Sequence, residues 1–290
     1  MSVFDIKEEA FEVIIDGKKY VGHLAYQELS PRPLVLIFPN VAGLKGFDQQ
    51  KAYEMAELGY VGLAVDLYGD HTIPFKDRED ALGSALPQIF GFMNELLCDK
   101  VELHKRMKAF LDAGLAHPAV DTSHGWAATG YCFGGACVAE LVRGGDFNPR
   151  GVVSFHGTID AQPMTLDPSV PAPAIKTTVP GNYSSDTRVL IENGEQDPFV
   201  PDAMIKGFRD EMNANEVMYT IHNYAQAGHA FAMPDHGPGP GIPGVGYQER
   251  AHRYSTLAMR DFFRYEVFPN VGQRLVGLDQ LHYHGSIASL

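Results

Sequence analysis

The stretch GYCFGG at residues 130–135 places a cysteine between glycines. The run 125–130 before it is apolar, and the residues after the cysteine have apolar side chains at helical spacing. This pattern predicts a strand that ends at Gly130 and a helix that begins after Cys132 and stops at Gly144. Cys132 would then lie on a sharp turn, with the helix N-terminus directed at its sulfur. Such an N-terminus favours the thiolate, which is the nucleophilic form of cysteine.

Two groups that could act with a thiolate follow later in the chain, first an aspartate and then a histidine. Asp197 lies in GEQDPFVP, after the apolar run 188–194, and His229 lies in AGHAFA, after the run 216–224. Active sites in open parallel sheets lie at the carboxyl ends of the strands, where all three residues are expected. Their order matches that of the G-x-S-x-G hydrolases of the α/β-hydrolase fold, with cysteine replacing serine. We therefore predict a triad of Cys132, Asp197 and His229.

Neighbouring residues offer alternatives for the acid and for the histidine. Glu195 and Asp202 lie close to Asp197 in the sequence, and an aspartate before a proline is also a common turn residue. His222 is the alternative to His229, but we expect His222 within the last strand rather than beyond it.

The elements that must position these groups follow from alternating sequence patterns. Two β-rich runs around Asp16-Gly17 predict a hairpin at about residues 10–27. Beyond it, apolar runs alternate with helix-like stretches, which predicts a mostly parallel sheet flanked by helices, with the antiparallel hairpin at its edge. The runs are 34–38, 61–69, 125–130, 151–157, 188–194 and 216–224, and the helical stretches are 46–59, 95–114, 201–215 and 248–268. We predict one α/β domain over residues 1–290, with a core at about 34–268 and a tail at about 269–290.

Two connections rich in proline or glycine interrupt the alternation, at 160–187 and 233–246. Neither composition favours a helix or a strand. Long loops inside compact domains are often lids or pocket walls, and a tolerated surface excursion explains them equally well.

Composition and charge exclude several classes of protein. The 23 Lys and Arg against 36 Asp and Glu give a net charge of −13, which argues against a nucleic-acid partner. No apolar run is long enough to span a bilayer, and the first residues lack the pattern of a signal peptide. The three cysteines suit a reducing compartment, and Cys98 and Cys137 are interpreted as small core residues. We expect a cytoplasmic protein without a membrane partner, and the sequence makes no prediction of the oligomeric state.

The motifs GYCFGG, GEQDPFVP and AGHAFA together resemble the dienelactone hydrolase family, with GYVGLAVDLYG and SFHG as supporting segments. The resemblance runs from about Leu34 to Phe263. It implies an α/β-hydrolase fold and the hydrolysis of small esters or lactones, with no metal and no cofactor. It also implies that Cys132 is the nucleophile, His229 the general base and acid, and Asp197 the group that orients the imidazole.

The same resemblance implies an oxyanion hole and marks two departures from the family. The hole would be formed by the backbone N–H groups of Val41, in the turn FPNVAG, and of Phe133. Asn40 stands where many members carry a glutamate. Met233 stands where the dienelactone enzymes place an arginine that binds the substrate carboxylate, four residues after the histidine. We therefore expect a less charged ester or lactone than dienelactone as the substrate.

Further residues are expected near the substrate pocket, which would include Asn40 and Met233. Tyr68 is one candidate, and His156 is another, for which a purely structural role is equally plausible. Arg78 or Lys76 could replace the missing cation, although nothing in the sequence aligns them with that role. The two histidines of LHYHG are assigned to the C-terminal tail rather than to a metal site.

Three functions remain open at this point. The favoured function is a thiol hydrolase of small esters or lactones. The second is a redox- or electrophile-reactive thiol protein that uses Cys132 without turnover, and Asn40 leaves this possibility open. The third is a catalytically silent relative retained for binding, against which the complete, ordered triad argues.

Overall fold

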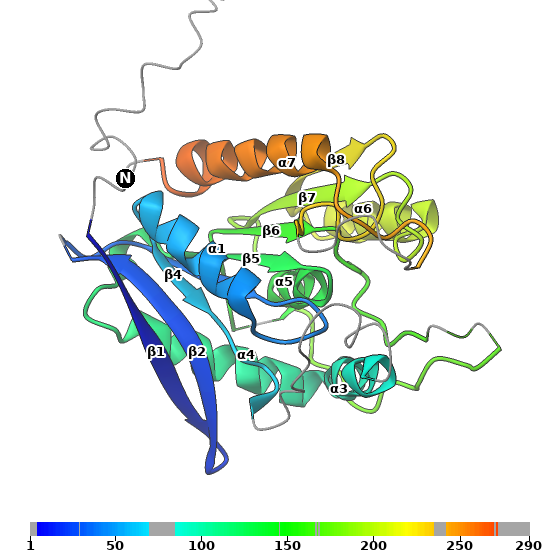
Figure 1. The fold of residues 1–290 in the computed structure, drawn as a ribbon, viewed down its shortest axis with the longest axis horizontal. Coiled ribbons are helices and arrows are strands. Elements are labelled where there is room, and N and C mark those ends of the chain that lie inside the picture. Colours follow the sequence, from blue (N-terminus) through cyan, green and yellow to red (C-terminus); the bar gives the residue numbers. More distant parts are fainter. Residues whose placement is uncertain are drawn as a thin grey trace, which may run out of the picture.

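The structure is a computed structural model, and it describes residues 5–28, 30–69, 85–144, 146–165, 167, 169–234, 242–269 and 271. Within these residues one sheet of eight strands runs through the molecule (Figure 1). The strands are β1 (Ile6–Ile15), β2 (Lys18–Gln27), β3 (Leu34–Phe38), β4 (Val61–Ala64), β5 (Trp126–Tyr131), β6 (Gly151–Phe155), β7 (Arg188–Gly194) and β8 (Met218–Tyr224). Their order across the sheet is β1-β2-β4-β3-β5-β6-β7-β8.

The predicted hairpin is present at one edge of the sheet. Strands β1 and β2 pair antiparallel from Ile6↔Gln27 to Ile15↔Lys18. Asp16 and Gly17 join them with positive φ angles of 50° and 77°, as a tight two-residue turn requires. The hairpin begins at Ile6 rather than near residue 10, because backbone pairing continues through a charged segment that shows no apolar pattern. Strand β2 is antiparallel to β4, and every pair from β4 to β8 is parallel.

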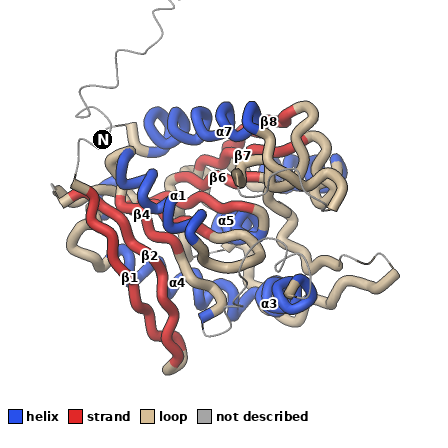
Figure 2. The backbone as a smooth tube through the Cα atoms, viewed as in Figure 1, coloured by secondary structure: helices blue, strands red, loops and turns tan. Residues whose placement is uncertain are grey.

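Helices cover both faces of the sheet, which explains why the central strands are apolar throughout (Figure 2). Helices α1 (Gly46–Glu57) and α7 (Glu249–Phe262) pack with one face of the sheet in one core cluster. Helices α3 (Leu86–Cys98), α4 (Lys100–Leu115), α5 (Phe133–Arg143) and α6 (Asp202–Ala214) contribute to the cluster on the other face. All residues of β3, β4, β5 and β6 are buried between them. A short 3-10 turn, η2 (Thr122–His124), and a π-helical turn, η3 (Phe263–Val267), complete the elements.

The prediction of one continuous helix over 95–114 is wrong, because the chain breaks at Asp99 between α3 and α4. Asp99 Oδ1 accepts a hydrogen bond from the N–H of Glu102 and thereby caps α4. The same oxygen accepts a bond from the hydroxyl of Thr177, 2.6 Å away, and the carbonyl of Cys98 accepts one from the N–H of Lys176. The break therefore depends on contacts with the distant connection 160–187.

Smaller differences concern the ends of elements. The strand predicted over 61–69 ends at Ala64, because Asp66 Oδ1 accepts hydrogen bonds from the N–H groups of Tyr68 and Gly69 and so forms a turn. Helix α5 ends at Arg143 with Gly144 as its cap, as predicted. Apart from residues 269 and 271, the predicted tail 269–290 lies outside the described residues, and with it the two histidines of LHYHG.

The connection 160–187, named the strap here, follows the α3–α5 side of the molecule without forming a helix or strand in its described residues. Asn94 of α3 exchanges two hydrogen bonds with the backbone of Met164. Thr177 binds the α3–α4 break, and the N–H of Asn182 donates to the carbonyl of Arg143 at the end of α5. The strap is thus fixed to three helices of one face.

Candidate active site

Cys132 lies on a sharp turn between β5 and α5, as the sequence predicts. Its φ of 57° and ψ of −113° lie in a region that residues other than glycine rarely adopt. Its N–H donates to the carbonyl of Phe155, 3.1 Å away, and its carbonyl accepts a bond from the N–H of Gly135, 2.9 Å away. The strained conformation presents the partly exposed sulfur at the carboxyl end of the sheet.

The two glycines of this turn are required by close backbone contacts. A Cβ atom on Gly130 would lie 2.0 Å from the carbonyl oxygen of Gly134. A Cβ atom on Gly134 would lie 2.1 Å from the carbonyl oxygen of Phe38, the last residue of β3. The absence of a side chain on Gly134 therefore lets the end of β3 lie directly against the first turn of α5.

The loops that follow β7 and β8 bring Asp197 and His229 to this turn. Asp197 Oδ2 lies 2.8 Å from Nδ1 of His229, and His229 and Cys132 line the same cavity. Asp197 Oδ1 accepts a bond from the N–H of Phe199, 2.8 Å away, which holds the carboxylate in place. Asp197 and His229 are each 5% exposed. The structure therefore brings the three predicted triad residues together at one site, with Asp197 hydrogen-bonded to His229 and His229 beside Cys132 on the cavity wall.

The alternative residues lie elsewhere. Glu195 and Asp202 are exposed, and Asp202 begins α6. His222 lies within β8, and its Nδ1 is 3.1 Å from Oε1 of Glu192, a buried residue of β7. The structure thus places His222 in the strand, paired with a different carboxylate.

The surroundings of His229 favour its charged form. Burial lowers the pKa of the imidazole, but the negative charge on Cys132 and the hydrogen bonds to Asp197 and Cys132 together raise it above its ordinary value. The imidazolium is therefore present below this raised pKa and is lost as the pH rises through it. Below that pKa the positive imidazolium faces the cavity that holds the Cys132 sulfur, where it can form an ion pair with a thiolate.

Iodoacetamide is expected to alkylate Cys132 already at slightly acidic pH, because the imidazolium of His229 stabilises the thiolate there. Asn40→Glu is expected to slow this alkylation by about tenfold, since a carboxylate in the same cavity opposes the thiolate charge. The measurement is the alkylation rate against pH by mass spectrometry, with Cys132→Ala as the control for Cys98 and Cys137. Alkylation confined to alkaline pH, at the same rate in Asn40→Glu, would contradict the ion pair.

Two aromatic side chains hold the His229 ring edge to face. The ring centroid of Phe199 lies 5.0 Å from that of His229 at an interplanar angle of 87°, and that of His156 lies 5.2 Å away at 67°. His156 is fully buried and also packs against Tyr131 and Phe231. Of the two roles considered for His156, the structure favours the structural one. The residue lies behind the imidazole of His229 and is not one of the cavity's wall residues.

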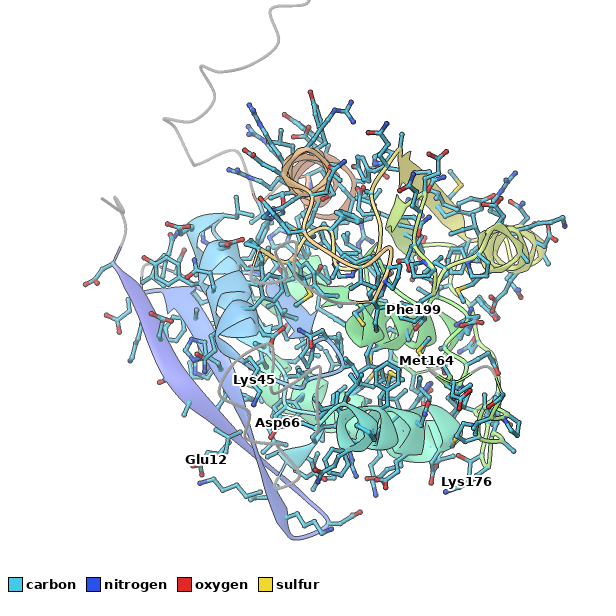
Figure 3. The ribbon with its side chains drawn as sticks, turned by 45° about the vertical axis from the view of Figure 1, so that its right-hand side comes forward. Glu12, Lys45, Asp66, Met164, Lys176 and Phe199 are labelled. Carbon is cyan, nitrogen blue, oxygen red and sulfur yellow. The ribbon has the colours of Figure 1, made fainter. Side chains whose placement is uncertain are left out.

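The cavity in front of Cys132 has a volume of about 80 Å³ and a largely apolar wall. Met164 of the strap and Phe199 lie together on one side of the molecule, where Figure 3 labels them. The apolar wall residues are Val41, Leu86, Phe90, Met93, Phe133, Met164, Phe199, Ala230, Met233, Ile242 and Val245. The polar wall residues are Asn40, Cys132, Thr158 and His229. No Lys, Arg, Asp or Glu lines the cavity in the part of the chain that the structure describes.

Residues expected in the pocket are distributed differently from the prediction. Asn40 and Met233 do line the cavity and touch one another, with Asn40 Nδ2 donating to Met233 Sδ at 3.9 Å. Tyr68 is buried beside the cavity and is not one of its wall residues. Arg78 and Lys76 lie outside the described residues. Val41 and Phe133, the predicted oxyanion-hole residues, both lie in the same cavity as the sulfur.

Residues 21–267 match the family model of the dienelactone hydrolase family. The chain belongs to this family. The family is one of hydrolases that act on ester bonds, so the predicted resemblance, enzyme class and α/β-hydrolase fold are confirmed.

Individual relatives show the extent of the similarity. A solved structure of a dienelactone hydrolase-like promiscuous phosphotriesterase from metagenomic libraries is 29% identical, has a TM-score of 0.71, and matches 90% of this chain and 98% of that chain. An uncharacterized protein of Caenorhabditis elegans is 28% identical over 163 residues, which are 56% of this chain and 93% of the relative. A protein of Bradyrhizobium sp., named "Probable 2-oxo-3-(5-oxofuran-2-ylidene)propanoate lactonase", is 24% identical over 80% of this chain and 86% of its own.

Most wall residues of the cavity in this member of the dienelactone hydrolase family were not predicted from the sequence. Phe90, Met164 and Ile242 are apolar residues of separate segments, and no spacing in the sequence connects them. Phe199 was missed as well, although its place two residues after Asp197 within the motif GEQDPFVP is a signal that could have found it. Among the described residues no helix is long and apolar enough to cross a membrane, and no group of three or more acidic, His or Cys side chains is arranged to hold a metal ion.

Proposed function

We propose that this protein hydrolyses small, uncharged carboxylic esters or lactones, with Cys132 as the nucleophile, His229 as general base and acid, and Asp197 as the orienting carboxylate. The observation that carries the proposal is the hydrogen bond between Asp197 and His229 at an apolar cavity that His229 and Cys132 both line. This arrangement supports nucleophilic catalysis, in which a base activates the thiol and a third group orients the base.

The reaction proceeds in two steps without a further reagent besides water. The Cys132 sulfur attacks the carbonyl carbon, and the C–O bond of the ester breaks to give a thioester while His229 donates a proton to the leaving oxygen. His229 then removes a proton from a water molecule, which attacks the thioester and releases the carboxylic acid and the sulfur. With a lactone, the leaving hydroxyl group remains on the same molecule. No metal or cofactor takes part in these steps.

The negative oxygen formed in each step requires hydrogen-bond donors next to the sulfur. We assign this role to the backbone N–H groups of Val41 and Phe133, which belong to the turn after β3 and to the first residue of α5. Gly134 supports the assignment, because its missing side chain allows these two segments to lie in contact. The N-terminus of α5 adds a positive partial charge at the same place.

The wall of the cavity supports an uncharged substrate. The wall holds no Lys or Arg side chain in its described part, and the contact between Asn40 and Met233 is neutral. The proposed substrate therefore differs from the one in the name of the Bradyrhizobium relative, which includes a propanoate and so a carboxylate. A volume of about 80 Å³ further favours a short acyl group. Because catalysis needs a reduced sulfur, and the chain's three cysteines are free, we also place the protein in the cytoplasm.

The proposal is tested by steady-state turnover of p-nitrophenyl acetate and of small lactones by the purified protein. Continuous turnover that is lost in Cys132→Ala supports hydrolysis. A stoichiometric burst of p-nitrophenol without a steady state would instead support the reactive-thiol function. An absence of both would support a silent relative.

Met233→Arg is expected to change the charge preference of the site. The unmodified protein should prefer p-nitrophenyl acetate to the mono-p-nitrophenyl ester of succinic acid. The variant should shift the ratio of the two kcat/KM values toward the succinate ester by about tenfold. The reason is that a nearby opposite charge stabilises a carboxylate by roughly one pKa unit or more. Met218→Arg is the control, because Met218 is 62% exposed on β8 and changes only the net charge. An equal shift in both variants, or none in Met233→Arg, would contradict this substrate assignment.

A further inference from the structure

Tyr68 lies behind the proposed oxyanion hole rather than in the substrate cavity. Its side chain is buried, at 4% exposed, in the turn that follows β4. Its hydroxyl group donates a hydrogen bond to the carbonyl oxygen of Val41, 3.1 Å away. Val41 also supplies one of the two N–H groups that we assign to the hole.

The peptide unit between Val41 and Ala42 is held at both ends by side chains. Its carbonyl group accepts the bond from Tyr68, and its N–H group donates to Oδ1 of Asn40, 2.8 Å away. The N–H of Gly43 closes the turn by donating to the carbonyl of Asn40, 3.0 Å away. The N–H of Val41 belongs to the adjacent peptide unit. Rotation of the 41–42 peptide would therefore also change the direction in which that N–H points, and so disturb the proposed oxyanion hole.

The ring of Tyr68 reaches the second residue of the hole. It stacks on the ring of Phe133, with centroids 6.1 Å apart and an interplanar angle of 12°. On its other side, Gly43 approaches so closely that an added Cβ would lie 2.8 Å from Cδ2 of Tyr68. A single side chain thus contacts both residues whose N–H groups would bind the negative oxygen.

Tyr68 is itself held by the turn that carries it. Asp66 Oδ1 accepts hydrogen bonds from the N–H groups of Tyr68 and Gly69, each at 2.9 Å, and Asp66 Oδ2 accepts one from Val21 on β2. Nη1 of Arg106, on α4, donates to the carbonyl of Leu67, 2.6 Å away. Burial raises the pKa of the Tyr68 hydroxyl well above its ordinary value, so the group remains a donor.

We propose that Tyr68 is a positioning residue that fixes the oxyanion hole, through its hydrogen bond to the carbonyl of Val41 and its stacking on Phe133. This inference rests on the proposed function. It assigns to the tyrosine of the segment DLYG a role in stabilising the transition state, with no contact to the substrate.

The test is Tyr68→Phe, which removes the hydroxyl group and keeps the stacked ring. For p-nitrophenyl acetate, kcat is expected to fall by about tenfold with KM changed less than about twofold, a smaller loss than the 10²–10³-fold typical for a direct donor. The Cys132 sulfur is expected to add to the carbonyl carbon of a small aliphatic trifluoromethyl ketone, and the resulting oxyanion would occupy the oxyanion hole. Its inhibition constant is therefore expected to rise by the same factor as kcat falls.

Two readouts separate positioning from a general structural effect. The rate of iodoacetamide alkylation of Cys132 and the melting temperature are expected to stay unchanged, because alkylation forms no oxyanion. Tyr60→Phe is the matched control, since Tyr60 is also buried but packs against Phe263 and Phe268 on the opposite face of the sheet. Tyr60→Phe should leave kcat, KM, the inhibition constant, the alkylation rate and the melting temperature unchanged.

The outcomes distinguish this inference from the proposed function. An unchanged kcat and inhibition constant in Tyr68→Phe would overturn the inference, as would a parallel loss of alkylation, which would mean that Tyr68 acts through the Cys132–His229 pair. If the unmodified protein turned over no ester but bound the ketone, and Tyr68→Phe weakened that binding, the inference would stand although the proposed function failed. A protein that neither turned over an ester nor bound the ketone would overturn both.

Discussion

Cys132→Ala is expected to abolish ester hydrolysis, with kcat/KM reduced by about 10⁴-fold or more. In the proposed mechanism the sulfur forms the covalent intermediate, and no other group of the site can replace it. Alanine removes only the sulfur atom, so the turn between β5 and α5 should keep its conformation. Steady-state kinetics measures the loss, and circular dichroism with a melting curve checks the fold.

The control for this substitution is Cys98→Ala. Cys98 is buried at the end of α3, and its loss should cost roughly 1 kcal/mol of stability with normal kcat/KM. Near-normal turnover in Cys132→Ala would show that the triad assignment is wrong, whatever the behaviour of the control.

Asp197→Asn is expected to lower kcat by about 10²–10⁴-fold with little change in structure. A neutral amide cannot stabilise the imidazolium of His229, and its NH₂ group can turn toward Nδ1 and select the wrong tautomer. The bond from the N–H of Phe199 can still be accepted by the amide oxygen, which should preserve the loop. The measurement is kcat with p-nitrophenyl acetate across pH.

Glu195→Gln is the matched control, because this carboxylate lies two residues away and is exposed. It should leave kcat within about twofold of the unmodified protein, as expected for an exposed position away from the reacting atoms. A large loss in Glu195→Gln together with a normal Asp197→Asn protein would move the acid to Glu195.

The positions of the candidate triad residues could be predicted because each one follows a parallel strand, and parallel strands end at the same edge of a sheet. The runs before Gly130 and Asp197 are largely apolar and buried, whereas β8, which precedes His229, is exposed or half-buried along its length. Glycine spacing added independent information, since Gly130 and Gly134 are required by backbone contacts that any sequence with this turn must make.

Other features could not be predicted because they depend on residues far apart in the chain. The break at Asp99 requires Thr177, and the apolar spacing around it continues as if one helix were present. Tyr68 was expected near the pocket and within the strand predicted over 61–69. The hydrogen bonds that Asp66 accepts turn the chain after Ala64, however, and the Tyr68 hydroxyl donates to the carbonyl of Val41 instead.

The strap has a consequence for how the substrate range of this enzyme can change. The candidate triad lies in the turns after β5, β7 and β8, whereas another part of the cavity wall comes from α3, from Met164 of the strap and from residues 242–245. The strap is attached to the helices by its own hydrogen bonds, none of which involves a triad residue. One part of the wall can therefore vary without touching the loops that carry the triad. Substitutions at Met164 or Phe90 are expected to widen the cavity while the triad keeps its geometry.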